Sequence, residues 1–122
     1  MDRIKSVEDL EVFKKAHGLT LKLYRVSKKF PEEERFNLTS QLRRAAVSIG
    51  ANLMEGGHRL NRKEFRQFAG ISKGSVGELK YYLLLSRDLE YISQAEYPIL
   101  RAEADEISKM LNGLIRSLSG TK

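Results

Sequence analysis

Apolar residues recur every three or four positions along most of this chain, which is the spacing of one face of an α-helix. The first stripe consists of Val12, Ala16, Leu19, Leu23, Val26 and Phe30. Ser6 and Asp9 precede it with the spacing of a capping box, and Pro31 follows it, where the missing amide hydrogen ends a helix. The pattern predicts a helix over residues 7–29.

A second stripe predicts a second helix. It consists of Leu38, Leu42, Ala45, Ile49 and Leu53. The start lies between Pro31 and Thr39, after three glutamates that suit the positive end of a helix dipole. Gly56 and Gly57 are expected to end this helix, because glycine readily takes the left-handed conformation of a C-cap.

Two further helices follow. Asn61, with Glu64 three residues later, is the expected cap of a helix that continues to about Tyr91. Its core stripe consists of Phe65, Phe68, Ser72, Val76, Leu79, Leu83 and Ser86. Ser93 and Glu96 form a capping box for the last helix, in which Pro98 marks a kink or the first regular position. The stripe of that helix consists of Ile107, Leu111, Leu114 and Leu118, beside Met110 and Ile115.

Short connections make consecutive helices antiparallel, so the fold class expected is all-α, an up-down-up-down four-helix bundle in a single domain over residues 1–122. The chain contains no cysteine, which excludes disulfides and thiolate chemistry. Its longest apolar run, residues 81–85, is too short to span a bilayer, and no secretory signal opens the sequence. We expect a cytoplasmic protein that does not enter a membrane.

The third helix carries apolar residues and glycines on the side opposite its core stripe. The interface predicted there consists of Gly70, Gly74, Gly77, Tyr81, Leu84, Leu85 and Leu89, with Ile71 nearby. Each glycine inside a helix costs about 0.8–1 kcal/mol relative to alanine, a cost that close approach of another helix offsets. Either this helix packs on both sides within one subunit, or its outer face binds further copies of the chain. The second interpretation predicts a homo-oligomer.

Basic residues outnumber acidic ones 22 to 16, a net charge of +6. The surplus lies between Arg35 and Arg87, where the net charge is +7. A set of these residues forms the candidate nucleic-acid surface: Arg43, Arg44, Arg59, Arg62, Lys63, Arg66, Lys73, Lys80 and Arg87. Such a surface is either a solvated helix flank or a site for the phosphates of RNA or DNA. No aromatic residue alternates with these charges, which argues against stacking on single-stranded bases.

No catalytic or metal site emerges from the sequence. Glu55 and His58 have a Glu-x-x-His spacing, but di-iron bundles need two such pairs and two further glutamates. Glu55 is better explained by an ion pair with Arg59, Arg62 or Arg44 at the corner between the second and third helices. We therefore expect no enzyme activity, no cofactor and no bound metal.

One stretch carries a family resemblance: residues 41–56, QLRRAAVSIGANLMEG, followed by Glu64-Phe65, Gly74-Ser75 and Glu78-Leu79. It resembles the four-helix-bundle proteins encoded by intervening sequences in bacterial large-subunit (23S) ribosomal RNA genes. The resemblance implies a bacterial protein that assembles into a ring, commonly a pentamer. It also implies a relation to the accessory variability determinant of diversity-generating retroelements, a basic protein that binds nucleic acid and a reverse transcriptase. The family implies no enzymatic activity.

Together these observations predict a homo-oligomeric helical scaffold that binds RNA or DNA through the basic surface of the second and third helices. The alternative is a protein-interaction module whose oligomer binds an acidic protein without nucleic acid.

Overall fold

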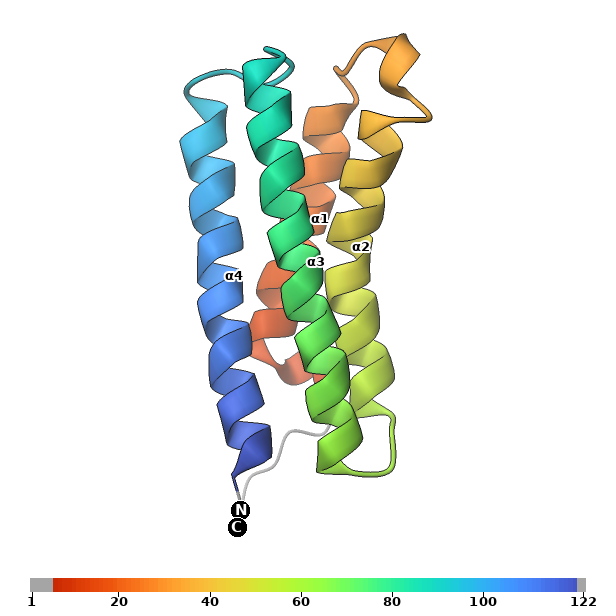
Figure 1. The fold of residues 1–122 in the computed structure, drawn as a ribbon, viewed down its shortest axis with the longest axis vertical. Coiled ribbons are helices and arrows are strands. Elements are labelled where there is room, and N and C mark those ends of the chain that lie inside the picture. Colours follow the sequence, from red (N-terminus) through yellow and green to blue (C-terminus); the bar gives the residue numbers. More distant parts are fainter. Residues whose placement is uncertain (1–5, 121–122) are drawn as a thin grey trace.

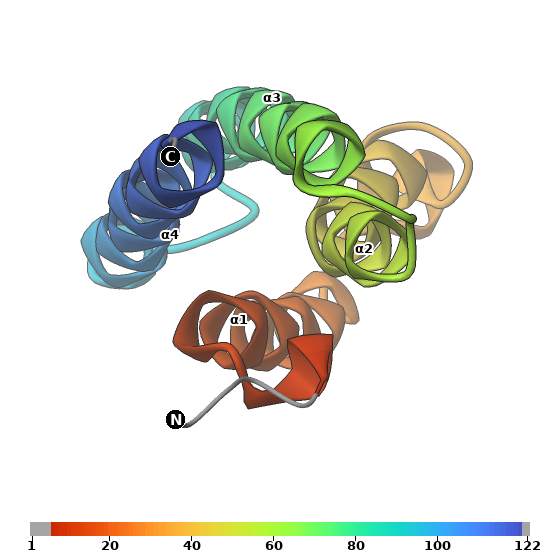
Figure 2. The ribbon, with the colours of Figure 1, turned by 90° about the horizontal axis from the view of Figure 1, so that it is seen from below.

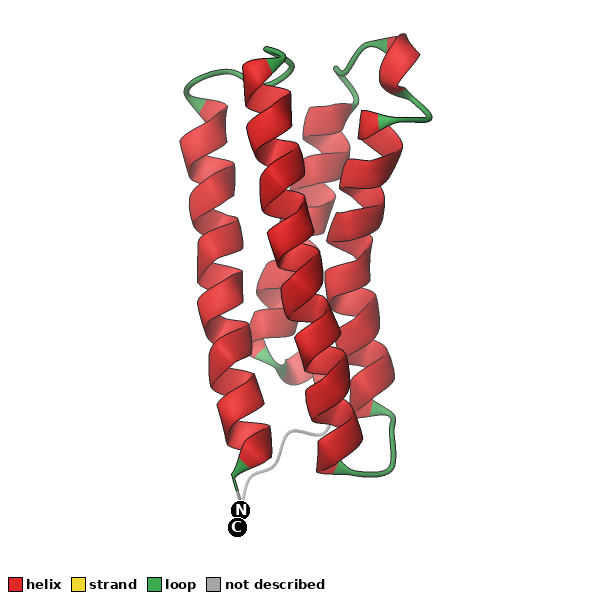
Figure 3. Ribbon diagram, in the orientation of Figure 1, coloured by secondary structure: helices red, strands yellow, loops and turns green. Residues whose placement is uncertain are grey.

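The structure is a computed structural model that describes residues 6–120. Its four long helices run alternately up and down (Figure 1). The elements are η1 (Val7–Asp9), α1 (Glu11–Ser27), η2 (Glu32–Glu34), α2 (Leu38–Gly57), α3 (Arg62–Asp88) and α4 (Glu96–Ser119). All regular structure within the described residues is helical (Figure 3). The predicted all-α four-helix bundle is confirmed.

The helices follow one another around the bundle in chain order (Figure 2). The contacts of α2 with α3 and of α3 with α4 are the most extensive, and those of α1 with α4 the least. The two central helices therefore share most of the core, while α1 is attached mainly through α2. None of the helices in residues 6–120 combines the length and the apolar character that crossing a bilayer requires.

The predicted stripes form the core. The largest fully buried side chains include five leucines, each with at most 1% of its surface exposed: Leu23, Leu42, Leu53, Leu79 and Leu111. Burial of each such side chain contributes roughly 1.5–3 kcal/mol. Phe65, Phe68, Leu114 and Leu118, also predicted for the core, lie nearer the bundle ends and are only half-buried.

Small residues let α2 and α3 approach closely. The hydroxyl of Ser72 donates to the carbonyl oxygen of Ile49 (2.8 Å), and the hydroxyls of Ser48 and Ser75 lie 2.8 Å apart. A Cβ at Gly56 would lie 2.6 Å from Cβ of Phe68, a separation that two carbon atoms do not tolerate. Glycine at position 56 is therefore required by packing. The left-handed cap expected at Gly56 and Gly57 is wrong: both residues belong to α2, no glycine of the described residues has a positive φ, and the helix is capped by His58 (φ −97°).

Three helix boundaries differ from the prediction. Leu10 is extended (φ −72°, ψ 133°) and separates η1 from α1, so residues 7–29 are not one continuous helix. The third helix ends at Asp88 rather than near Tyr91, because Glu90 takes a left-handed conformation (φ 66°). The fourth helix already begins at Glu96, and Pro98 sits in its first turn, where an amide hydrogen would have no partner within the helix.

The hydrogen bonds of the caps predicted at the starts of α3 and α4 are confirmed. The backbone amide of Glu64 donates to the side chain of Asn61 (2.9 Å), which caps α3. Ser93 and Glu96 exchange two hydrogen bonds of 2.9 Å, one from each backbone amide to the other side chain. At the start of the chain, the amide of Ser6 donates to Asp9 (3.3 Å), but this box precedes the short η1 rather than α1.

Candidate nucleic-acid interface and outer face of α3

The nine candidate cationic residues lie on α2, on α3 and in the loop between them. Four of them form ion pairs. Arg44 binds Glu78 (2.6 Å), and Lys80 binds Asp105 (2.8 Å), so these two pairs connect α2 to α3 and α3 to α4. Two further pairs are local: Arg59 with Glu55 (2.9 Å) and Arg87 with Asp88 (2.9 Å). The predicted ion pair of Glu55 is confirmed, with Arg59 as its partner. These four cations serve the bundle itself.

Glu78 accepts hydrogen bonds from two helices. The hydroxyl of Tyr82 and the guanidinium of Arg44 each donate to it at 2.6 Å, and Arg44 is held in turn by Gln41 (2.8 Å). The bond from Tyr82 and the adjacent Arg44 hold the pKa of Glu78 below its ordinary value, against a smaller effect of burial. The same bond raises the pKa of Tyr82. Glu78 is therefore ionised at neutral pH and fixes α3 to α2.

The other five cations have no carboxylate partner within residues 6–120. Arg43 donates to the hydroxyl of Ser27 (2.8 Å), and Arg62 donates to the carbonyl oxygen of Ser117. Lys63, Arg66 and Lys73 make no hydrogen bond or ion pair to another described residue. Their charges are available to an anion without breaking a bond inside the bundle.

Lys73 and Arg66 lie on the side of α3 that faces α4. Residues seven apart occupy nearly the same position around a helix, and Lys80, seven residues after Lys73, binds Asp105 on α4. Arg66 is exposed and Lys73 is half-buried. The flank next to α4, at the lower half of α3 in Figure 1, is therefore where unpaired positive charge gathers.

Aromatic rings lie beside some of these charges in the structure, although no aromatic residue alternates with them in the sequence. Three of the six candidate arginines lie over rings: Arg43 over Tyr24, Arg59 over Phe68 and Arg87 over Tyr97, at 4.6, 4.8 and 4.7 Å from the ring centres. None of these rings neighbours its arginine in sequence, so the linear pattern concealed them. The rings are engaged by cations of the same chain and hold these arginines against the bundle.

The predicted oligomer interface lies on the exposed side of α3. A Cβ added at Gly70, Gly74 or Gly77 would meet no atom within 4 Å, so close packing inside the chain does not explain these glycines. α3 does contact both neighbouring helices, α2 and α4, within one subunit, but these contacts leave its three glycines uncovered. Tyr81 is 57% exposed and Leu89 45%, whereas Leu84 and Leu85 are half-buried. Whether another copy covers this face stays a prediction.

The comparisons with known proteins agree with the fold. The model of the 23S rRNA-intervening sequence protein family matches residues 8–113. The chain belongs to this family. The crystal structure of a protein of unknown function from the S23 ribosomal protein family of Bacteroides thetaiotaomicron is similar, with 28% sequence identity and a TM-score of 0.79. The match covers 85% of this chain and 97% of that chain.

A search of curated proteins found no match. The family resemblance seen in the sequence is thus confirmed, while the relation to the accessory variability determinant stays a prediction. The residues that carry the resemblance meet in space: Arg44 binds Glu78, Ser48 binds Ser75, and Gly56 packs on Phe68. In this member of the family, that stretch of sequence holds α2 against α3.

In the described part of the chain, Glu55 and His58 do not form a metal site. Nδ1 of His58 lies 2.9 Å from the carbonyl oxygen of Met54, and Glu55 binds Arg59, so the Glu-x-x-His residues have separate partners. Within residues 6–120, no three metal-ligating side chains cluster.

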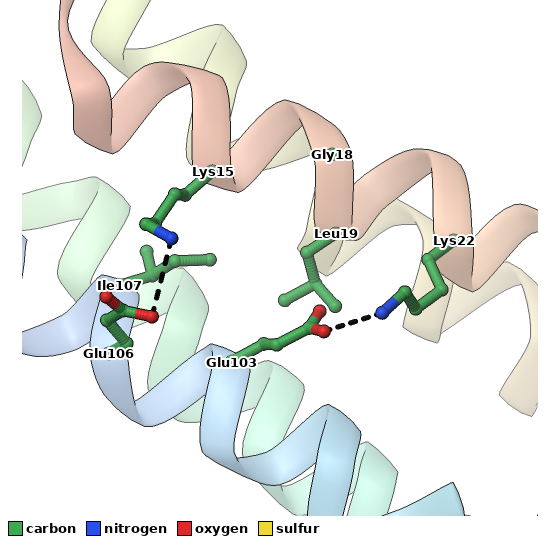
Figure 4. A pocket seen from close by; sticks show the side chains of 7 residues that line it. All are labelled: Lys15, Gly18, Leu19, Lys22, Glu103, Glu106 and Ile107. Atoms are coloured by element: carbon green, nitrogen blue, oxygen red, sulfur yellow. Dashed lines mark hydrogen bonds and ion pairs between the residues drawn. The ribbon is translucent and has the colours of Figure 1, made fainter.

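A groove that sequence analysis missed lies between α1 and α4 (Figure 4). It encloses about 430 Å³ above Leu19 and Ile107, and two ion pairs cross it. Lys22 binds Glu103 (2.6 Å), and Lys15 binds Glu106 (3.6 Å). Because each charge in the groove already has an opposite partner, these residues join α1 to α4 rather than present a charged site.

Proposed function

We propose that this protein is a homo-oligomeric scaffold that binds RNA or DNA without sequence specificity. The observation that carries the proposal is that Lys63, Arg66 and Lys73 lie on one helix and have no ion-pair partner among residues 6–120. Lysine and arginine that contact phosphates release counterions, which drives binding at low salt. The other six candidate cations add positive charge to this surface, although four of them form ion pairs and Arg43 and Arg62 donate hydrogen bonds within the bundle.

The beginning of α3 favours the same ligand. His58 and Arg59 lie in the loop before α3, and Arg62 is its first residue, at a helix end whose dipole attracts phosphate. Assembly of several copies would repeat this surface around a symmetry axis. Several weak contacts to one nucleic acid would then give a higher overall affinity than each contact alone. The exposed apolar face of α3 supports such assembly, since large exposed apolar patches on soluble proteins mark association sites.

The test compares the salt dependence of nucleic-acid binding between two charge variants. Fluorescence anisotropy with labelled RNA and DNA duplexes and single strands is followed from about 50 to about 200 mM salt. For Arg66→Gln/Lys73→Gln we expect weaker binding to every sequence and a salt slope reduced by about two per chain. The matched control is Arg25→Gln/Lys28→Gln, which removes two exposed charges without an ion pair among residues 6–120 from the end of α1 and should leave the slope nearly unchanged.

Absence of binding to any nucleic acid at about 50 mM salt would contradict the proposal, because phosphate contacts are strongest there. The alternative, an acidic protein partner, predicts a different result. Partners recovered with the protein would then remain after nuclease treatment, whereas partners held through nucleic acid would be lost.

A further inference from the structure

A pocket lies between the end of α1 and the beginning of α2, toward the upper end of the bundle in Figure 1. It encloses about 490 Å³, within the range of small-molecule sites, roughly 300–1,000 Å³. Among the described residues, no carboxylate lines it. Its lining combines arginines, aromatic rings and a hydroxyl: Tyr24, Arg35, Phe36, Thr39, Arg43 and Arg44.

Arg43 is held in place on the wall of this pocket. Its Nε donates to the hydroxyl of Ser27 (2.8 Å), and one of its terminal nitrogens donates to the carbonyl oxygen of Tyr24 (3.2 Å). Its guanidinium also lies over the Tyr24 ring, 4.6 Å from the ring centre. The other terminal nitrogen has no partner among residues 6–120. A guanidinium fixed in this way loses little conformational freedom when its remaining hydrogens bind an oxyanion.

Thr39 supplies a hydroxyl that the fold itself does not use. The residue is only 8% exposed, yet its hydroxyl makes no hydrogen bond to another described residue. Every fully enclosed polar side-chain atom in residues 6–120 does have a partner, so this hydroxyl retains access to the pocket. Thr39 and Arg43 are four residues apart and therefore lie on the same face of α2.

The backbone at the start of α2 adds to these unpaired donors. Asn37 makes no side-chain cap, and the amides of Thr39 and Ser40 have no partner among the described residues. Free amides in the first turn of a helix favour an anion nearby. Together with the Thr39 hydroxyl and Arg43, they make this corner of the bundle suitable for phosphate.

Phe36 adds an aromatic ring to the same pocket. The residue is 81% exposed, so burial in the fold does not account for a phenylalanine here. Arg35 lies over one face of the ring, 5.2 Å from its centre, which leaves the other face open. Exposed rings beside cations are the platforms on which single nucleic-acid bases stack.

Two of the three glutamates of η2 lie outside the pocket. Glu34 accepts hydrogen bonds from the amide of Leu38 (3.2 Å) and from the hydroxyl of Tyr91 (2.9 Å). These bonds hold its carboxylate on the side of α2 that faces α3. Glu33 is exposed and does not line the pocket. Neither carboxylate therefore occupies the place of the phosphate.

The third glutamate leaves Arg35 available. Glu32 pairs with Arg35 at 3.4 Å, but both side chains are mostly exposed, and such pairs contribute little stability. A phosphate can therefore replace Glu32 at low cost. Arg44 is different, because Glu78 already neutralises it at 2.6 Å. The positive charge that a ligand can use in this pocket comes from Arg35 and Arg43.

We propose that this pocket binds one nucleotide unit, with the base stacked on Phe36 and the phosphate held by Arg35, Arg43 and the hydroxyl of Thr39. A simple phosphate would leave the ring unused, and an apolar ligand would leave the arginines and the hydroxyl unpaired. The nucleotide is either free or an unstacked position of a single strand. A base-paired duplex offers no base to the ring, so this site goes beyond the proposed function and does not depend on it.

The experiment places a fluorescent reporter in the pocket. The chain contains no tryptophan, so Phe36→Trp introduces a single indole, whose fluorescence is quenched by a stacked base. The ligands are adenosine 5′-monophosphate, adenosine, a single-stranded oligonucleotide and closed circular duplex DNA, with inorganic phosphate as a competitor. We expect saturable quenching by the monophosphate, binding of adenosine weaker by about tenfold or more, and no quenching by the duplex.

The matched control is Ile99→Trp. This position is also apolar and exposed (57%), and it lies in the first turn of α4, at the same end of the bundle. The control should show no saturable quenching by any of these ligands. Circular dichroism confirms that both tryptophan variants retain the fold.

Three substitutions in the unsubstituted chain test the assigned contacts by calorimetric titration. Phe36→Leu keeps an apolar side chain without a ring and should weaken binding of the monophosphate by about fivefold or more. Arg35→Gln and Thr39→Val should each weaken it by about three- to tenfold and leave adenosine binding unchanged. Because the Thr39 hydroxyl has no partner in the fold, urea unfolding of Thr39→Val should show no loss of stability.

The outcomes separate this inference from the proposed function. Equal affinity for the monophosphate and the single strand would identify a free nucleotide as the ligand, and much tighter binding of the strand would identify nucleic acid. No saturable quenching by either, adenosine bound as tightly as its monophosphate, or unchanged binding by Thr39→Val would overturn the inference.

Salt-dependent binding of the duplex without any quenching by the monophosphate would overturn the inference and leave the proposed function standing. Quenching by the monophosphate in a protein that binds no nucleic acid at low salt would support the pocket and contradict the proposed function.

Discussion

At the residue scale, glycines that look alike in sequence have different roles. Gly56 is buried where α2 meets α3, and a Cβ there would meet Phe68 at 2.6 Å and Phe65 at 2.9 Å. Gly18, in the middle of α1, is exposed and has open space around it. Only the first is explained by packing within the chain, so alanine should have opposite effects at the two positions.

We predict that Gly56→Ala lowers the free energy of unfolding by about 1–3 kcal/mol, because the added methyl overpacks the contact between α2 and α3. Gly18→Ala should raise it by about 0.5–1 kcal/mol through better helix propensity. Urea unfolding followed by circular dichroism measures both changes. Equal effects of the same sign at both positions would contradict this assignment.

At the element scale, α3 depends on a single side-chain cap. Asn61 accepts the amide hydrogen of Glu64, while the neighbouring loop residue Leu60 is 96% exposed and contributes almost no packing there. The first turn of α3 therefore depends on the cap more than on burial. This turn also carries Arg62 and Lys63, so its stability affects the proposed binding surface.

We predict that Asn61→Ala costs about 1 kcal/mol of unfolding free energy and loosens the first turn of α3. Asn61→Ser keeps an oxygen acceptor at the cap and should restore most of the loss. Urea unfolding gives the energies, and hydrogen exchange at the amide of Glu64 reports the cap directly. An alanine variant as stable as the serine variant would show that this cap does not stabilise α3.

At the scale of the whole molecule, the four helices are unequally attached. The α2–α3 and α3–α4 contacts contain most of the packing, whereas α1 meets α4 across a groove crossed by exposed ion pairs such as Lys22–Glu103. Exposed ion pairs contribute little and are screened by salt. α1 is therefore the helix expected to detach first.

We predict that hydrogen exchange is faster at Leu19 and Leu23 of α1 than at Val76 and Leu79 of α3, although all four side chains are buried. Raising the salt from about 0.1 to about 1 M should increase the difference, because the ion pairs to α4 weaken. Variants Lys15→Gln/Lys22→Gln should show the faster exchange of α1 already at low salt. The same exchange rate in both helices would mean that the bundle opens as one unit.

The spacing of apolar residues predicted the four helices and their core faces, and the polar pairs Asn61–Glu64 and Ser93–Glu96 predicted the caps of the last two helices. These features depend on residues within one or two helical turns of each other, which a linear pattern contains. The ion pair of Glu55 with Arg59, four residues apart, was predictable for the same reason. The extended backbone of Leu10 and the left-handed backbone of Glu90 could not be predicted, because neither leucine nor glutamate is typical of a helix end.

Only the tertiary structure decided which basic side chains are free of ion pairs and can bind an anion. Arg44 finds its carboxylate 34 residues away at Glu78, and Lys80 finds Asp105 on a different helix, so the charge pattern alone could not separate paired residues from unpaired ones. The rings beneath Arg43 and Arg87 and the pocket between α1 and α2 likewise arise from neighbouring helices. The sequence determines local periodicity, whereas pairing and surface shape depend on how the helices pack.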